Sequence, residues 1–377
     1  MKFKFMSLAA MAACVAFTSC SNDDEPGANK GNVALTQVSV GINHVANSRA
    51  GITATSFSGN ESIGLYLFGG AGVDEADATA KRYNQGLEGG TVKEPLNVKY
   101  TRGGDEANTG NPEWWTSTNP IILSSKVGKL YAYYPYAETN ADATGLAIPT
   151  NIPAAQGTGI SDGTKDVAGV YDYMYGLAVS NEGNNNVSNN TTHVDFQMNH
   201  ALTMVSFKFV RDTYPGEGKI SKIKLYNDAA GEYLKAGVAT MHIGTGAISG
   251  AAASTEGVYC LPEQVLTDVG ADDESTGLMA TIPHMLVYPN ATPMTAGTVR
   301  LEITMDGKVY DIELPNKIRS AQEPYTWVAG KNYVYTLKMT GYGFGANDED
   351  GKDDIDVTIK EWDEDFVEDG NLTKPIN

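Results

Sequence analysis

Residues 298–314 read "TVRLEITMDGKVYDIEL", in which apolar and polar residues alternate on both sides of an Asp-Gly pair. The dipeptide Asp306-Gly307 is favoured in two-residue hairpin turns, because both turn positions need a positive φ. Folding the chain there brings three apolar pairs onto one face: Val299 with Leu314, Leu301 with Ile312, and Ile303 with Tyr310. Arg300 then faces Glu313 on the other face, as an exposed pair worth about 0.2–1 kcal/mol. A slip of one residue would undo this pattern, so the stretch predicts an antiparallel hairpin.

The rest of the chain repeats this pattern of short β-branched and aromatic runs separated by Gly, Asn, Asp and Pro, and helical periodicity is scarce. Six further stretches are typical of strands: 62–68, 96–101, 129–136, 173–179, 201–210 and 220–227. The Asn-rich stretch 181–192 between them is expected to be a surface loop. A chain of 377 residues is long enough for two domains. We predict an all-β protein with two tandem antiparallel β-sandwich domains, 50–197 and 198–377.

The first 19 residues predict a secretory signal peptide. Two lysines precede the apolar run Met6–Thr18, which is too short to span a bilayer core of roughly 30 Å as a helix. The run ends in "AFTSC", which resembles the lipobox of bacterial lipoproteins although Phe17 stands in place of the usual leucine. This resemblance implies that Cys20 is lipidated, with a palmitate among its acyl chains, and becomes the first residue. The alternative is ordinary cleavage nearby, with Cys20 left as a free thiol.

The residues after Cys20, "SNDDEPGANKG", are acidic and rich in Gly, Asn and Pro, which is typical of a flexible tether. The acidic run also resembles the surface-export signal of Bacteroidetes lipoproteins. If Cys14 leaves with the signal and Cys20 carries lipid, Cys260 has no partner, so we expect no disulfide framework. A net charge of -19 disfavours a nucleic-acid partner, because phosphate binding needs clustered Lys and Arg.

Candidate catalytic and metal-binding residues are sparse. His193 and Asp195 share one face of a strand and could begin a metal site, but no further ligand completes a set. The acidic run 347–356 lacks the ligand spacing of an EF-hand. The sequence has no Gly-x-Ser-x-Gly elbow and no P-loop. We therefore expect no catalytic residues, no metal and no cofactor, and we do not expect an enzyme.

Several of the strand sequences occur in a familiar order along the chain. They are "ESIGLYLF" (61–68), "WWTSTNPIIL" (114–123), "KLYAYYPY" (129–136), "YDYMYG" (171–176), "FQMNHALTMVSFKF" (196–209) and "WVAGKNYVYTLKM" (327–339). This ordered set resembles the fimbrillin-like family of Bacteroidetes, the pilins of type V pili with their anchor and tip relatives. The resemblance implies transthyretin-like pilin domains and a structural subunit of a pilus, held at the outer membrane by lipid.

The resemblance also gives a role to Arg49, the first arginine of the chain, which lies in "HVANSRAG" (44–51). In such pilins, an arginine-specific protease cuts after an N-terminal arginine, and the segment that leaves is a β-strand. A cut between Arg49 and Ala50 would remove residues 20–49, a tether followed by a strand whose Val38, Val40 and Ile42 share one face. The empty groove would accept a strand from the next subunit. The alternative is an arginine that is never cut, as in anchor subunits, which keep their lipid.

The incoming strand should resemble the strand that it replaces. In "DIDVTIKEW" (354–362), Ile355, Val357 and Ile359 repeat the same spacing, with Trp362 beyond them. These residues are candidates for the donor strand. The alternative is that they close the sheet of their own C-terminal domain, in which case the donor would be the tail around Phe366–Ile376.

The alternative function is carbohydrate binding, because carbohydrate-binding surface lipoproteins share β-sandwiches and a similar export signal. Trp114 and Trp115, together with the tyrosines of Tyr131–Tyr136, could serve as stacking platforms for sugars. Alternation along the strand puts Tyr131 and Tyr133 on one face and Tyr134 and Tyr136 on the other. At least one of these pairs is expected to lie in the core.

Overall fold

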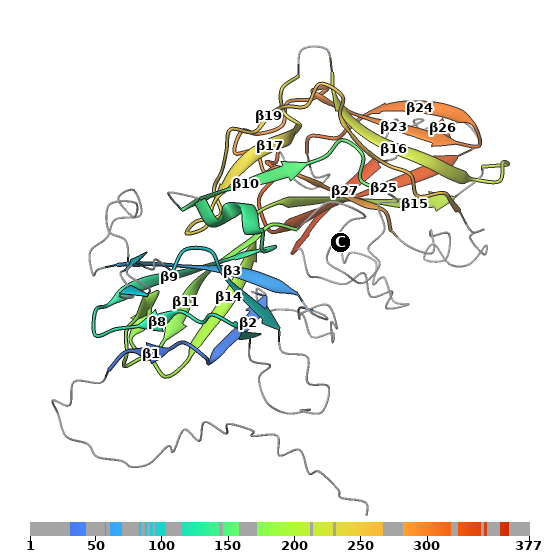
Figure 1. The fold of residues 1–377 in the computed structure, drawn as a ribbon. Helices are drawn as coiled ribbons and strands as arrows, with labels where there is room; N and C mark the ends of the chain where they lie inside the picture. Colours follow the sequence, from blue (N-terminus) through green and yellow to red (C-terminus); the bar gives the residue numbers. More distant parts are fainter. Residues whose placement is uncertain are drawn as a thin grey trace, which may run out of the picture.

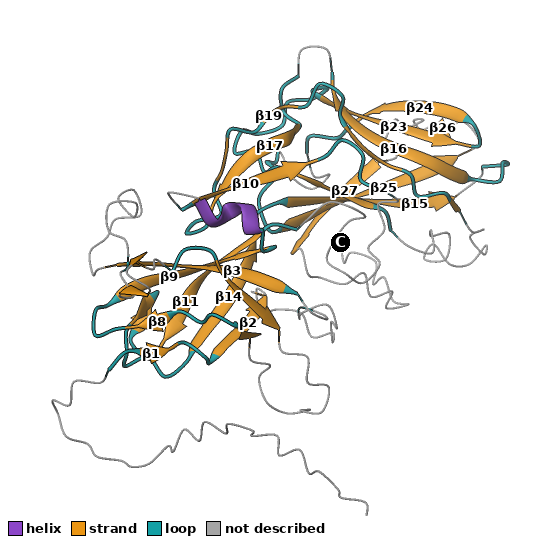
Figure 2. Cartoon of the chain, in the orientation of Figure 1, coloured by secondary structure: helices purple, strands orange, loops and turns teal. Residues whose placement is uncertain are grey.

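The structure is a computed structural model. It describes residues 31–42, 57, 61–69, 83, 87–88, 91–92, 95–102, 115–142, 146–157, 172–211, 214–228, 231–266, 282–317, 323–340, 343–344 and 355–361. These residues form strands and connecting loops, with one short 3-10 helix, η2 (Glu138–Asp142) (Figure 2). The prediction of an all-β protein is confirmed.

The strands gather in two lobes (Figure 1). The first lobe holds a nine-stranded sheet in the order β12-β11-β14-β2-β7-β6-β3-β9-β13, and an additional pairing of β9 with β11 closes the sheet on itself. Its strands are β2 (Val38–Ile42), β3 (Ser62–Gly69), β6 (Val98–Arg102), β7 (Trp115–Thr116), β9 (Gly128–Tyr134), β11 (Met174–Ser180), β12 (Gly183–Asn184), β13 (Asn186–Val187) and β14 (Val194–His200). Two small pairs accompany it: β1 (Val33–Ala34) with β8 (Ile122–Leu123), and β4 (Leu87–Glu88) with β5 (Thr91–Val92).

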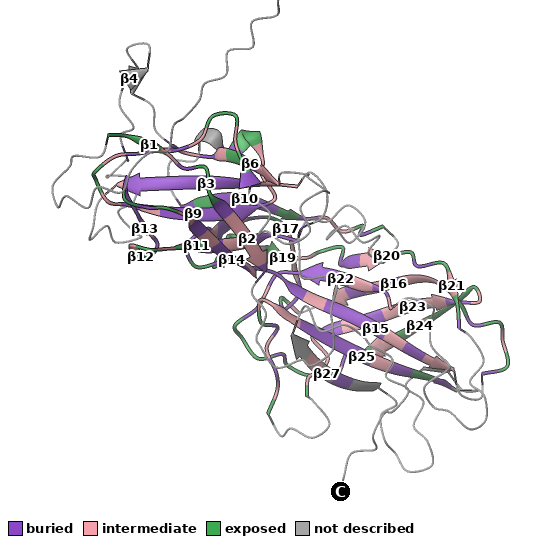
Figure 3. Ribbon diagram, turned by 90° about the horizontal axis from the view of Figure 1, so that it is seen from below, coloured by how far each residue is buried: buried purple, intermediate pink, exposed green. Residues whose placement is uncertain are grey.

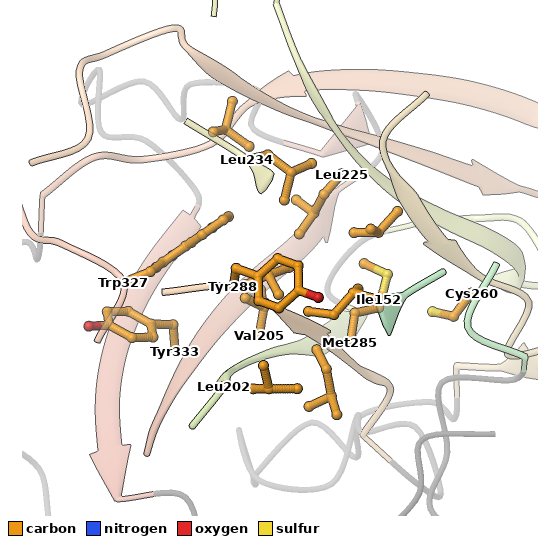
Figure 4. Close-up of a cluster of buried hydrophobic side chains, with 14 of the residues drawn as sticks. Ile152, Leu202, Val205, Leu225, Leu234, Cys260, Met285, Tyr288, Trp327 and Tyr333 are labelled. Carbon is orange, nitrogen blue, oxygen red and sulfur yellow. The ribbon is translucent and has the colours of Figure 1, made fainter. Parts of the chain in front are cut away.

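The second lobe contains two five-stranded sheets. One has the order β22-β15-β25-β26 with β27 also on β25, and the other has the order β20-β16-β23-β24 with β21 on β16. The strands of the first are β15 (Thr203–Arg211), β22 (His284–Val287), β25 (Lys331–Thr340), β26 (Gly343–Phe344) and β27 (Ile355–Glu361). Those of the second are β16 (Lys219–Asn227), β20 (Val258–Cys260), β21 (Gln264–Val265), β23 (Val299–Met305) and β24 (Lys308–Glu313). Side chains from both sheets, such as Val205 and Leu225, are fully buried in one core (Figure 4).

The predicted hairpin is confirmed as β23 and β24, with the expected register of Leu301 opposite Ile312 and Ile303 opposite Tyr310. Asp306 and Gly307 both have positive φ, at 49° and 73°, as a turn of this kind requires. The ion pair differs from the expectation. Arg300 faces Glu313 but bonds the carboxylate of Asp311, with Nε 2.9 Å from Oδ1. A diagonal neighbour is within reach of a long side chain, which explains the difference.

We expected all strands to pair antiparallel, but two of the pairings are parallel. β2 pairs with β14 in parallel, and so does β15 with β25. The parallel partners are far apart in the sequence, and parallel strands cannot be joined by a tight turn. Local turn signals therefore carry no information about these two pairings.

β10 (Ala147–Ile152) connects the two lobes. It lies in a small sheet of the second lobe with β17 (Lys235–His242), β18 (Ile248–Ser249) and β19 (Ala252–Ala253). Ile152 is buried near Met285 and Tyr288 (Figure 4). Beyond it, the buried Gln156 donates from Nε2 to Leu286 O and accepts from Leu286 N at Oε1, both at 2.8 Å. The division into 50–197 and 198–377 stays a prediction: its boundary falls within β14, and β10, which precedes the boundary, pairs with β17, which follows it.

The strands β3 and β9 are buried on both faces, and Figure 3 shows β3 almost wholly buried. Leu65 and Leu130 belong to the core of the first lobe, whereas Tyr66 and Tyr131 belong to the larger core that continues into the second lobe. The helix η2 is held against this second face, because the Tyr66 hydroxyl donates to Asn140 O at 2.7 Å. Neighbouring residues of one strand thus serve different cores.

Candidate functional site: the N-terminal strand and its groove

The first described residues, 31–42, run along the first lobe and form the strand that we expected from the sequence. β1 pairs with β8, and β2 lies between β14 and β7 in the closed sheet. The parallel register with β14 runs from Val38 opposite Val194 to Ile42 opposite Met198. The contact with β7 is much shorter, with Val38 opposite Trp115 as its register pair. β2 therefore depends mainly on β14 for its backbone hydrogen bonds.

The inward side chains of this segment are part of the lobe's core. Val38 is 0% exposed and Ile42 is 3% exposed, while Val40 is half-buried and packs against the same cluster. The shared face predicted for these three residues is thus present. Leu35, 3% exposed, fills the same core. We did not identify Leu35 from the sequence, because it lies outside the alternating run, and its apolar character three residues before Val38 was the signal available.

Backbone hydrogen bonds fix the segment upstream of β2. Leu35 N donates to Ile121 O at 2.8 Å, and Val194 N donates to Gln37 O at 2.9 Å. The buried Tyr100 hydroxyl donates to Leu35 O at 2.9 Å and accepts from Ile121 N at 3.1 Å. Burial raises the pKa of Tyr100 well above its usual value, so the hydroxyl keeps its proton and remains a donor to Leu35.

The outer face of β2 meets polar side chains of β14. The Ser39 hydroxyl donates to a carboxylate oxygen of Asp195, whose other oxygen lies 3.5 Å from His193 Nε2. Gly41 lies beneath the amide of Gln197, and a Cβ at Gly41 would be 3.2 Å from Gln197 Oε1. The groove that holds β2 therefore has an apolar inner face and a polar outer face.

The residues around β2 define what its departure would leave. On β14, Val194, Phe196 and Met198 are fully buried, and Trp115 of β7 is 1% exposed. Without β2, these apolar side chains would meet water, and the β14 edge that bonds β2 would lose its partner. An unpaired strand edge beside an apolar groove is a template for an added strand.

The candidate donor strand occupies a place in its own sheet. β27 pairs antiparallel with β25 from Lys331 opposite Glu361 to Leu337 opposite Ile355. Val357 is 2% exposed, and Ile359 packs against the core from a half-buried position. Residues 355–361 therefore extend the sheet of their own lobe in this structure, as the alternative to the donor role describes. A role as donor requires β27 to leave β25.

Several predicted site residues lie outside the described residues. They are the lipidation site Cys20, the processing residues Arg49 and Ala50, Trp114, Trp362 and the tail around Phe366–Ile376. The predictions about them stay predictions.

Most of the described aromatic residues of the carbohydrate alternative lie in the core. Tyr136 is half-buried, with Lys99 Nζ 5.4 Å from its ring centroid. Trp115 contacts Phe57 edge-on, with ring centroids 5.1 Å apart, and is 1% exposed. Tyr131, Tyr133 and Tyr134 are all buried. These side chains cannot stack on a sugar in this fold.

The polar clusters of the described residues offer little for metal chemistry. His193 and Asp195 are close, as expected from their shared strand face. Within the ranges that the structure describes, no group of three or more His, Cys, Asp or Glu side chains could hold a metal ion. In the same ranges, no helix is both long and apolar enough to cross a membrane.

Comparisons with known proteins agree with the geometry. The model of the family described as fimbrillin-like matches residues 48–362. A fimbrial protein from Bacteroides vulgatus has a similar structure, with a TM-score of 0.54 and 15% identity over 88% of this chain and 100% of its own. A Bacteroides ovatus protein assigned to cell adhesion gives 0.53 and 17% over 89% and 99%. No curated protein matches the sequence. The chain therefore belongs to the fimbrillin-like family, whose members are structural proteins of cell-surface pili and not enzymes.

Proposed function

We propose that this chain is a pilus subunit that is exported as a lipoprotein through Cys20 and anchored in the outer membrane. An arginine-specific protease then cuts between Arg49 and Ala50, and residues 20–49 leave. The vacated groove receives a strand from another subunit, so that the pilus grows by strand exchange. No cofactor takes part in this assembly.

The observation that carries the proposal is the position of residues 31–42. Their contacts with the lobe are hydrogen bonds and apolar packing, and they lie upstream of Arg49 in the sequence. After a cut at Arg49, the covalent link to the rest of the lobe would be gone, and only these contacts would retain β2. This arrangement supports the proposal that a single cut would make the segment exchangeable.

The energy of the vacated site explains why a replacement strand is needed. Burial of Leu35, Val38 and Ile42 contributes roughly 1.5–3 kcal/mol each, or about 5–9 kcal/mol together. This is comparable with the whole stability of a typical domain, about 5–15 kcal/mol. An empty groove would therefore leave the lobe barely stable, and the lobe would bind a new strand strongly.

A second role within the same family is an anchor that keeps its lipid. In such a subunit β2 would stay in the groove, where the side chains of Val38 and Ile42 are buried. Such a subunit would hold the base of the pilus and could still donate a strand.

The experiment that decides between them is to determine the mature N-terminus of the protein recovered from the cell surface, by intact mass and N-terminal sequencing. A chain that begins at Ala50 supports the polymerising subunit. A lipid-blocked chain that begins at Cys20 contradicts cleavage and supports the anchor.

A further inference from the structure

The outer face of the groove contains groups that can distinguish one incoming strand from another. Asp195 of β14 accepts a hydrogen bond from the Ser39 hydroxyl, and Gln197 lies over Gly41. The position of Ser39 thus suits a hydroxyl or a cation and disfavours a carboxylate. The position of Gly41 lies beside an amide, which can donate to a carboxylate.

The inward-facing residues of the candidate donor strand have the same order in both strand directions. Ile355, Val357 and Ile359 present Ile-x-Val-x-Ile whichever way the strand enters. The apolar pockets left by Val38, Val40 and Ile42 therefore cannot fix its direction. Only the outward residues between them differ.

The outward residues favour one direction. If the strand entered in the direction of β2, Asp356 would take the place of Ser39 and face the Asp195 carboxylate. Like charges directly opposite each other across strands are destabilising. In the reverse direction, Thr358 takes the place of Ser39 and supplies a hydroxyl to Asp195. Lys360 then lies one outward position farther on, diagonal to the same carboxylate, which adds a favourable charge contact.

Reversal also improves the other outward position and the backbone pairing. Asp356 then takes the place of Gly41, beside the Gln197 amide. The pairing with β14, which spans all of β2, becomes antiparallel, and antiparallel pairing is slightly the more stable per residue. Reversal makes the pairing with β7 parallel and so slightly less stable. This loss is small, because β7 is two residues long and contributes the single register pair Val38–Trp115.

We propose that residues 355–360 of a second copy of this chain enter the groove antiparallel to β14, opposite to the direction of β2, and that Asp195 selects this direction. The inference rests on the proposed strand exchange. It assigns to Asp195 the specificity of the groove, a role separate from that of the apolar pockets.

Disulfide trapping on the full-length chain, processed by an arginine-specific protease, tests the direction. The chain carries either Gln197→Cys with Asp356→Cys, which the reverse direction brings together, or Gln197→Cys with Thr358→Cys, which the direction of β2 brings together. Cys260 does not compete, because it is fully buried and burial raises its pKa to about 12. Each version keeps one outward residue that favours reversal: Thr358 in the first, Asp356 in the second.

We expect the first version to form intermolecular disulfides about fivefold more than the second, because cross-strand side-chain pairs favour the reverse direction. Adding Asp195→Lys should shift the yield toward the second version, because Asp356 would then face a cation. The matched control is Glu217→Lys, an exposed acid of the second lobe, which makes the same change in net charge and should leave the ratio unchanged.

The outcomes separate this inference from the proposed function. A higher yield from the second version with Asp195 intact overturns the assigned direction. Polymers that form without either disulfide mean that another segment is the donor, which overturns the inference and leaves strand exchange standing. A chain that keeps residues 20–49 under the protease and forms no polymer overturns the proposed function itself.

Discussion

Leu35 provides a direct test of the proposed removal of the N-terminal strand. In the uncut chain, Leu35→Ala removes a side chain that is 3% exposed and belongs to the core of the first lobe. Leucine-to-alanine changes in cores cost about 2–5 kcal/mol, the higher values arising where the cavity cannot collapse. The backbone of Leu35 is held at both its N–H and its carbonyl, by Ile121 and Tyr100, which limits collapse. We therefore expect Leu35→Ala to lower the free energy of unfolding of the uncut chain by an amount in the upper part of this range.

The assay is denaturant unfolding of two forms, the uncut chain and the processed subunit in its assembled state. The matched control is Leu65→Ala, which removes a fully buried leucine from the same core on β3, a strand that stays. Leu65→Ala should destabilise both forms. Leu35→Ala should destabilise only the uncut chain, because residue 35 leaves with its strand. Equal destabilisation of both forms by Leu35→Ala would refute the removal of the strand, and a loss below about 1 kcal/mol in the uncut chain would refute its placement in the core.

Two further predictions concern the second lobe. Gln156→Ala should lower the free energy of unfolding by about 2–4 kcal/mol, because it leaves the buried N–H and carbonyl of Leu286 unbonded. Hydrogen exchange at the Leu286 amide should accelerate. The control Gln197→Ala, at an exposed glutamine, should change the free energy of unfolding by less than about 0.5 kcal/mol. Burial lowers the pKa of His284 to about 4, despite a hydrogen bond to Ile282 O that raises it. The unfolded chain binds a proton near pH 6.5 and the folded chain does not, so stability should fall by up to about 3 kcal/mol as the pH drops from 6.5 to 4. His284→Gln should remove this slope, and an unchanged slope would contradict it.

Local signals in the sequence identified those elements whose partners are close by. The hairpin β23–β24 was predictable to the residue because the turn dipeptide and the alternation agree on a single register. β2 was predictable as a strand from the alternation of Val38, Val40 and Ile42. Its partner was not, because β14 lies more than 150 residues away, as the sequence separation of Ser39 and Asp195 shows. Nothing in either strand alone specifies a parallel pairing.

Composition misled in the Asn-rich stretch 181–192, which we expected to be a surface loop. The structure places β12 and β13 there and buries Asn185 and Ser188. The Glu182 carboxylate accepts hydrogen bonds from the backbone and hydroxyl of Ser188, which explains how polar residues can be buried here. Side-chain hydrogen bonds accompany the apolar packing of Val187 in this stretch, and hydrophobic patterning cannot detect such bonds.

The crossing of β10 into the second lobe was also beyond sequence reasoning, and it bears on function. In the proposed strand exchange, force on the pilus acts on the lobe that holds the groove and has to be transmitted to the rest of the subunit. The links include β10, paired along β17, and the Gln156 side chain, bonded to the backbone of Leu286. Hydrogen bonds along a paired strand resist shear together, whereas a flexible linker would let each lobe move alone. The segment that we propose to be exchanged and the segment that links the lobes are thus different strands, so the proposed departure of β2 would leave the link through β10 in place.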